Sequence, residues 1–236
     1  MKKTLLIMTS LLLLFAFIPN AKAQDEEESS WNAGLDIYSS YIWRGAKFGN
    51  GPAFQPAVSF ATGGFEIGAW GSVSSSMDEG YEMDLYSGYS FELSENSSLG
   101  INLTDYYFGG DWTSGDNHFI EPNVSLGLGG FSIMGAYMFM PDGYYSANGD
   151  ENKGDIYLEA GYSFEHFSLG LAAGEGQYTY HMTDDEEEKD DFGICVISIG
   201  TSKEIPITEK FTLPVSGAVI LNPSTGGFFI TVGISL

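Results

Sequence analysis

Short segments of alternating apolar and polar residues follow one another through most of the chain, and this pattern restricts the fold more than any other feature. In residues 226–236, every even-numbered position from Phe228 to Leu236 is apolar, and the odd-numbered positions after Phe229 are small or polar. Side chains of a β-strand point alternately to opposite faces. Each such segment is therefore expected to form a strand with one apolar face and one small or polar face.

Twelve segments of this kind predict an all-β chain. They span about 31–44, 53–62, 65–75, 80–93, 98–108, 118–128, 131–141, 155–165, 167–179, 192–202, 211–221 and 226–236. Most approach the 9–11 residues that a tilted strand needs to cross a bilayer. Tight connections such as 127–131 alternate with long polar ones such as 141–155. The pattern predicts a transmembrane antiparallel up-and-down β-barrel of about 12 strands, with turns on the periplasmic side and long loops outside.

Aromatic residues lie near both ends of the expected strands. Phe60 and Phe131 adjoin turns, whereas Tyr41 and Trp43 lie toward the loop ends, as expected of two interfacial girdles. The alternative is a soluble β-sandwich or barrel whose apolar face forms the core. A second face rich in Gly, Ser and acidic residues favours a hydrophilic lumen instead. One residue breaks the pattern, because alternation places Asp105 on the lipid side unless a bulge or a position above the hydrocarbon removes it.

The first residues have the features of an export signal. Two lysines precede an apolar run over 4–18, and Ala21-Lys22-Ala23 fits a cleavage site, so we expect residues 1–23 to be a cleaved signal peptide. Residues 24–30 form an acidic leader, and 31–236 form the barrel. The alternative is a signal anchor, for which the run is short. Export and the barrel pattern together predict the outer membrane of a Gram-negative bacterium.

The charge is strongly acidic, with 32 Asp and Glu against 9 Lys and Arg. A net charge of −23 repels phosphate backbones and excludes nucleic acid as an expected partner. Alternation turns many acids toward the lumen: Asp36, Glu66, Glu82, Asp84, Glu92, Glu121, Asp155 and Glu159. A lumen lined in this way is expected to prefer cations. The alternative is that these acids only solvate a narrow or plugged interior, since side chains can fill a small barrel.

Arg44 is the clear basic residue on the inward face. We expect it to brace the mouth of the barrel by pairing with Glu82 and Asp84, with Gln55 and Trp70 filling the lumen nearby. The alternative is a solvent-exposed arginine at the rim.

Three segments in order resemble the TorF-like porin family, long catalogued as conserved hypothetical bacterial proteins. They are residues 39–45 (SSYIWRG), 51–56 (GPAFQP) and 68–72 (GAWGS). The resemblance is densest over residues 36–73 and extends loosely to the C-terminus. It implies an outer-membrane barrel and a pore, and it brings no catalytic residues.

Catalytic and metal-binding patterns are weak. His118, His166 and His181 are the candidate general bases, but no Ser-His pairing or Gly-x-Ser-x-Gly pattern accompanies them, so we expect no enzyme. We expect no cofactor and no metal. The acidic run 184–191 is interpreted as a solvated outer loop, with a divalent-cation or partner site as the alternative. Cys195 is expected to be a small apolar filler within a strand.

Three hypotheses for function follow. The first is a porin or narrow channel for small, cationic or neutral solutes. The second is a non-conducting structural or interaction barrel with acidic loops, and the third is an outer-membrane hydrolase. The expected partners are outer-membrane lipid, the barrel-assembly machinery during insertion, and small solutes.

Overall fold

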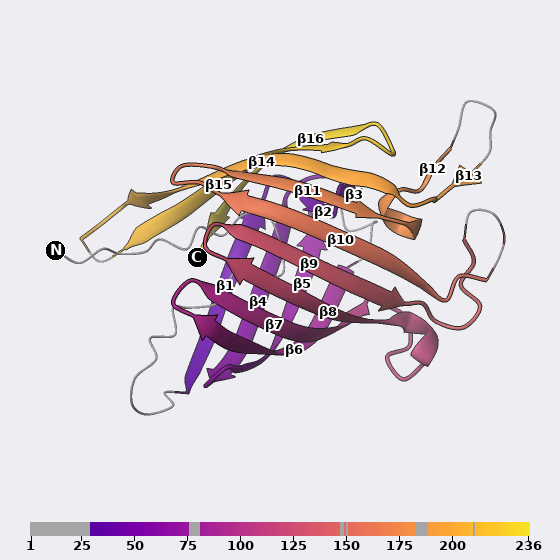
Figure 1. Cartoon of the computed structure of the whole chain (residues 1–236), viewed down its shortest axis with the longest axis horizontal. Helices are drawn as coiled ribbons and strands as arrows, with labels where there is room; N and C mark the ends of the chain where they lie inside the picture. The colour runs from indigo at the N-terminus through magenta and orange to yellow at the C-terminus, as the bar shows by residue number, and fades with distance from the viewer. Residues whose placement is uncertain (1–28, 76–80, 147–148, 150, 183–187, 210) are drawn as a thin grey trace.

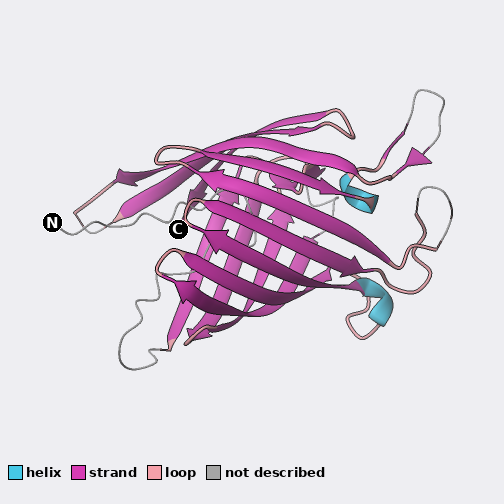
Figure 2. Ribbon diagram, viewed as in Figure 1, coloured by secondary structure: helices cyan, strands magenta, loops and turns pink. Residues whose placement is uncertain are grey.

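Twelve antiparallel strands close into one barrel in the computed structural model (Figures 1 and 2). The structure describes residues 29–75, 81–146, 149, 151–182, 188–209 and 211–236. The strands are β1 (Ser30–Tyr38), β4 (Ala53–Thr62), β5 (Phe65–Ser74), β6 (Tyr81–Ser94), β7 (Ser97–Tyr107), β8 (His118–Leu128), β9 (Phe131–Phe139), β10 (Gly154–Ser163), β11 (Ser168–Gly174), β14 (Gly193–Pro206), β15 (Thr212–Asn222) and β16 (Gly227–Ser235). Each strand pairs with its sequence neighbour, and β1 pairs with β16. The predicted fold class is confirmed.

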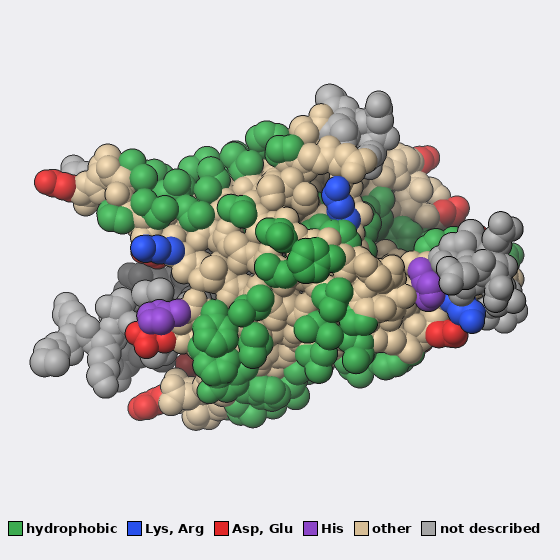
Figure 3. Space-filling view, turned by 90° about the horizontal axis from the view of Figure 1, so that it is seen from above, with side chains coloured by type: hydrophobic (Ala, Val, Ile, Leu, Met, Phe, Trp, Pro, Cys, Tyr) green, Lys and Arg blue, Asp and Glu red, His purple; other side chains and the backbone are tan. Residues whose placement is uncertain are grey.

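The outer wall of the barrel is apolar. One face of each strand carries exposed large hydrophobic side chains, among them Ile67, Leu103, Val124, Ile199 and Ile230. Figure 3 shows hydrophobic side chains spread over the wall, while the acidic side chains and histidines visible on this face lie toward the two ends. A monomer in water rarely exposes so much apolar surface, whereas a barrel surrounded by lipid requires it.

The two ends of the barrel differ. At one end, here called the turn end, tight turns such as 63–64 and 129–130 join the strands. At the other, the loop end, the connections are longer and include the 3-10 helices η2 (Gly115–Asn117) and η3 (Gly176–Tyr178). The short pair β12 (His181–Met182) and β13 (Glu188–Lys189) also lies there. Within the described ranges, no helix is long and apolar enough to cross a membrane.

The first and last strands form the seam that closes the barrel. Three register pairs join them, from Asp36 opposite Ser235 to Tyr38 opposite Gly233. Leu35 and Leu236 add two backbone hydrogen bonds, at 3.1 and 3.0 Å. A side chain at Gly233 would overlap the Tyr38 ring, so a residue without Cβ lets the two strands meet here.

Two predicted strands were too long. The first was expected to run to Arg44, but β1 ends at Tyr38 and the chain then turns into the barrel. The ninth was expected to reach residue 179, but β11 ends at Gly174, after an irregularity between Ala172 and Ala173. The signal peptide 1–23, most of the leader 24–30, and residues 184–187 of the acidic loop lie outside the described residues.

Candidate functional site

The connection between β1 and β4 folds into the barrel as a hairpin. Within residues 39–52, here called the lumen hairpin, β2 (Tyr41–Trp43) pairs with β3 (Ala46–Phe48) in a separate two-stranded sheet. Figure 1 shows both strands in the interior of the barrel. All residues from 41 to 45 are buried, and Trp43 is only 3% exposed. The tip of the hairpin is therefore enclosed by the wall.

The sequence of the tip fits a tight hairpin turn. Arg44 and Gly45 both have positive φ, at 50° and 81°, as in the two-residue turns that match the twist of paired strands. Asn-Gly usually occupies such turns, and an arginine in the left-handed region is strained. A side chain at Gly45 would overlap the Cys195 carbonyl oxygen, so the turn also requires glycine. Surrounding contacts must therefore hold Arg44 in place.

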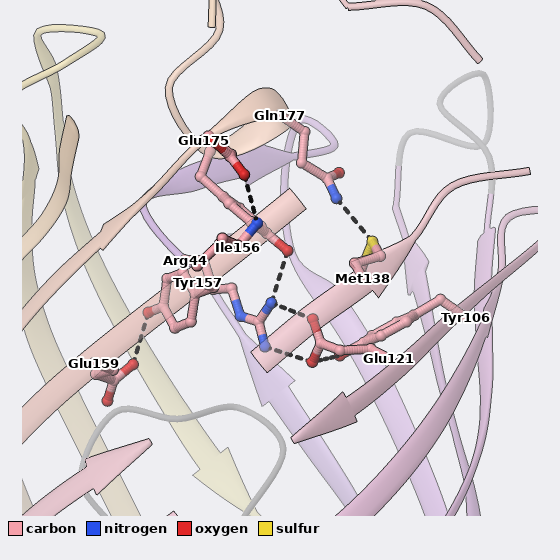
Figure 4. Close-up of polar contacts among 10 residues, drawn as sticks. Arg44, Tyr106, Glu121, Met138, Ile156, Tyr157, Glu159, Glu175 and Gln177 are labelled. Atoms are coloured by element: carbon pink, nitrogen blue, oxygen red, sulfur yellow. Dashed lines mark hydrogen bonds and ion pairs between the residues drawn. The ribbon is translucent and has the colours of Figure 1, made fainter. Parts of the chain in front are cut away.

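Those contacts are ionic and direct (Figure 4). The two terminal nitrogens of Arg44 donate to the two carboxylate oxygens of Glu121 on β8, at 2.6 and 2.7 Å. One of them also donates to the Tyr178 hydroxyl on η3, at 2.7 Å. The Tyr106 hydroxyl donates to Glu121 at 3.2 Å. Glu121 is 1% exposed, so this is a bidentate ion pair removed from solvent.

Aromatic rings enclose the guanidinium. Its central carbon lies 4.1 Å from the centre of the Tyr157 ring, 4.8 Å from Trp43 and 5.2 Å from Tyr178, within the range of cation–π attraction. Burial raises the pKa of the Tyr178 phenol above its usual range, so this hydroxyl stays protonated and accepts from Arg44 through a lone pair. Asn222 on β15 also holds the turn in place. Its side-chain amide donates to the backbone carbonyls of Gly45 and Tyr178, at 3.1 and 2.9 Å.

The other side of the hairpin contacts β5 and β6. The ring centres of Tyr41 and Trp70 are 5.7 Å apart, and the Tyr41 hydroxyl hydrogen-bonds the Glu82 carboxylate. Burial, followed by the nearby carboxylates of Glu82 and Asp84, raises the pKa of Tyr41 well above its ordinary value. The phenol is therefore a neutral donor to Glu82. The lumen hairpin thus contacts β5 and β6 through Tyr41, and β8 and η3 through Arg44.

A cavity lies against the hairpin and extends toward the turn end. The space is open to solvent and totals about 1000 Å³, of which about 80 Å³ admits the centre of a water molecule. Hairpin residues Ile42 and Trp43 line one end, and wall residues from several strands line the rest: Asn102, Glu121, Asn123, Ser132, Glu159 and Ser198. Apolar wall side chains share the lining with these polar ones, among them Met134, Leu169, Val196 and Ile220. The cavity can therefore hold water and small polar or cationic solutes.

The predicted lumen residues occupy different depths. Gln55, Trp70, Glu82, Asp84, Glu121 and Asp155 are all buried at 8% exposure or less. Asp36, Glu66 and Glu159 are partly buried, and Glu92 is exposed near the turn end of β6. Asp36 and Glu66 hydrogen-bond Ser235 and Ser59, and Glu159 accepts from the Tyr157 hydroxyl at 2.7 Å.

Two predictions about the hairpin were wrong, and one alternative is excluded. Arg44 pairs with Glu121 and not with Glu82 or Asp84, because the chain turns inward after Tyr38 and carries it across the lumen. For the same reason Arg44 is not an exposed rim residue, at 8% exposure. Tyr41 and Trp43 are buried in the lumen and do not belong to a lipid-facing girdle.

Sequence reasoning also missed three tyrosines around the Arg44–Glu121 pair. Tyr106 and Tyr157 lie on the polar side of their strands, where alternation could have found them. Tyr178 lies on η3, where the strand pattern has ended, so no periodic signal was available. Asn222, at the loop end of β15, is completely buried and was also missed.

The three histidines that were candidate general bases make ordinary structural contacts. His118 Nδ1 lies 2.9 Å from an Asp105 oxygen, and Nε2 lies 2.9 Å from the Trp112 carbonyl oxygen. The strands β7 and β8 pair without a register shift at Asp105, so no bulge turns this side chain away from the lipid side. The contact with His118 partners the outward carboxylate instead. His166 is exposed at the turn end beside Glu165, and His181 Nδ1 contacts the Thr179 carbonyl at 2.8 Å.

A closed antiparallel barrel with an apolar outer wall and a hairpin inside its lumen places the chain in the class of transmembrane β-barrels. Residues 21–209 match the family described as bacterial protein of unknown function (Gcw_chp), and the chain belongs to this family. A comparison with curated proteins finds no match.

Among solved structures, the NanC porin has a TM-score of 0.51 at 11% identity, over 85% of this chain and 97% of the porin. The KdgM porin has a TM-score of 0.46 at 10% identity, over 86% and 97%. An outer membrane channel from Pseudomonas putida F1 has 0.45 at 11% identity, over 93% and 98%. At such identity the likeness to NanC concerns the fold alone.

Proposed function

We propose that this protein is a channel for small solutes in the outer membrane of a Gram-negative bacterium, narrowed by the lumen hairpin. The observation that carries the proposal is a narrow cavity, lined in part by amide and carboxylate side chains, inside a barrel whose outer wall is apolar. Such a barrel is stable in lipid, and a polar interior provides a path for solutes that lipid excludes. Its partners would be the surrounding lipid, the barrel-assembly machinery and the solute, with no cofactor.

The resemblance of residues 39–45, 51–56 and 68–72 to the TorF-like porin family supports the same proposal. Two of these segments belong to the lumen hairpin or adjoin it, and the third contains Trp70, which packs on Tyr41. The residues that carry the resemblance are thus those that position the hairpin in the lumen.

A preference for cations forms part of this proposal. Glu121 and Glu159 line the cavity, and Arg44 is the only buried basic residue among those described. Arg44 is paired with Glu121, so its charge is compensated within the lumen. Glu159 and the remaining carboxylates then give the path a negative potential, which concentrates cations.

One observation favours a second candidate function. The lumen hairpin and its aromatic neighbours form a cluster of buried side chains inside the barrel. A barrel filled in this way could serve as a non-conducting scaffold whose loops bind partners. A hydrolase has less support, since both ring nitrogens of His118 are occupied by Asp105 and a carbonyl.

Single-channel recording in planar bilayers tests the proposal. We expect small or infrequent conductance steps from the native chain, and a reversal potential on the cation side in a salt gradient. Tyr38 and Ala53 are register partners, so a two-residue Asn-Gly turn can replace residues 39–52 without moving the wall. This hairpin-free variant should conduct more than the native chain.

Migration on a gel before and after heating checks that each variant is folded, because it distinguishes a closed barrel from an unfolded chain. A hairpin-free variant that is folded and inserted but shows no conductance would overturn the channel and support the scaffold. A conducting variant with anion selectivity would overturn only the argument from the acidic lumen.

A further inference from the structure

Two carboxylates at the loop end of β6 are buried without a cation among the described residues. Glu82 and Asp84 face inward from the same strand and are 5% and 0% exposed. Both oxygens of Asp84 and one oxygen of Glu82 have no hydrogen-bond partner among the described residues. Burying an unpaired carboxylate is strongly unfavourable, so folded proteins neutralise such groups.

Arg44, the basic residue expected to pair with these carboxylates, is bonded to other residues. Both terminal nitrogens of Arg44 are bound to Glu121, and one also binds Tyr178. Lys47, the other basic residue of the lumen hairpin, is exposed and donates to Asn50. No other basic side chain in the described part of the chain is buried. The pair must therefore be neutralised by something other than these side chains.

An independent polar group points to a ligand at the same place. Gln55 is 1% exposed, and its side-chain carbonyl oxygen has no partner among the described residues. Its amide nitrogen lies 3.4 Å from the Ser72 hydroxyl, and Ser72 is the register partner of Glu82. Gln55 thus lies in the same inward row as the carboxylates, with a free acceptor oxygen.

The lumen hairpin lies against Glu82 and the residues beside it. Its Tyr41 hydroxyl binds Glu82, and the Tyr41 ring packs on Trp70, the register partner of Asp84. The unpartnered atoms of this group are all oxygens, from two carboxylates and one amide carbonyl. Hard cations select such sets, whereas soft or borderline metals prefer sites that include nitrogen or sulfur.

We propose that Glu82, Asp84 and Gln55 bind a calcium ion between the barrel wall and the lumen hairpin. Two carboxylates balance the charge of one divalent cation. Calcium accepts irregular sets of protein oxygens, while magnesium keeps several waters and requires nearly ideal octahedral geometry. A site at which Asp84 is completely buried therefore suits calcium better. The proposal concerns binding, and it holds whether or not the barrel conducts.

Terbium luminescence tests this site in the folded, detergent-solubilised chain. Tb³⁺ replaces Ca²⁺ at oxygen sites and emits when a nearby tryptophan or tyrosine is excited, and Trp70 and Tyr41 adjoin the carboxylates. We expect sensitised emission that Ca²⁺ competes away, and at least a tenfold weaker affinity in the isosteric variants E82Q and D84N. Q55L should weaken affinity by a smaller factor.

Two control variants separate this site from other acids. E151Q removes an exposed carboxylate that pairs with Lys153, and D184N/D185N removes charge from the acidic loop. Both should keep the emission and its calcium competition. Gel migration before and after heating checks that each variant is folded. The proposal is overturned if the folded native chain gives no calcium-competed emission, or if folded E82Q and D84N bind Tb³⁺ as tightly as E151Q.

Discussion

The bidentate pair between Arg44 and Glu121 gives the most informative perturbation. In R44A, the Glu121 carboxylate remains buried at 1% exposure and loses both of its close donors on Arg44. Removing one partner of a buried ion pair costs about 3–5 kcal/mol, because the remaining charge is uncompensated. Moving the lumen hairpin out of the lumen lets water reach Glu121 and relieves this cost. The substitution should therefore favour the open position.

The size of the effect follows from that energy. A change of 3–5 kcal/mol corresponds to a factor of about 150–5000 in the ratio of open to closed positions. Burial of Tyr41, Ile42 and Trp43 still favours the closed position, by about 1.5–3 kcal/mol for each large apolar side chain. We therefore expect R44A to show frequent, brief openings, not a permanently open pore.

Single-channel recording in planar bilayers measures this ratio directly. K47A is the matched control, because Lys47 lies on the same hairpin, carries the same charge, and is exposed. K47A should behave as the native chain does. R44A/E121Q should open less often than R44A, since the neutral amide gains less from hydration. If folded R44A opens no more often than K47A, the ion pair does not hold the hairpin and the reasoning is refuted.

Three further predictions concern other parts of the barrel. G45A should also increase opening, because the turn requires positive φ and the new methyl group meets a backbone carbonyl; a pore of native behaviour would contradict this. E159Q should lower the cation-to-anion permeability ratio measured by reversal potential, whereas a variant at the exposed Glu151 should leave it unchanged. Finally, H118A leaves the outward Asp105 without its partner and should lower the denaturant midpoint of the barrel in detergent, by roughly 1 kcal/mol in unfolding free energy. D105N/H118A should recover part of this loss, and equal midpoints for all three chains would show that the pair contributes nothing.

Alternation predicted the wall well because every spanning strand separates the same two environments. The rule that places Ile230 outside and Thr231 inside is local, and it holds for each strand independently. It therefore located twelve strands without any knowledge of which strands pair.

The same rule misplaced the lumen hairpin for a physical reason. β2 is itself a strand, so Tyr41 and Trp43 continue the alternation of β1, although the chain changes direction between β1 and β2. The Arg44-Gly45 turn and the glycines at 49 and 51 mark a hairpin, but their composition also fits an external loop. The partner Glu121 is 77 residues away, and no local pattern could connect it to Arg44.

The lumen hairpin is bonded to the last strand of the barrel as well as to distant parts of the wall. The Ser39 backbone nitrogen donates to the Val232 carbonyl at 2.8 Å, and the Thr231 hydroxyl donates to the Ser40 carbonyl at 3.1 Å, across 191 residues. These bonds join the base of the hairpin to β16, and β16 also completes the seam with β1. During assembly, neither the seam nor these bonds can form until β16 arrives. Sealing of the wall and docking of the hairpin base are thus a single late event, and an unfinished barrel has its first hairpin still unanchored to that strand.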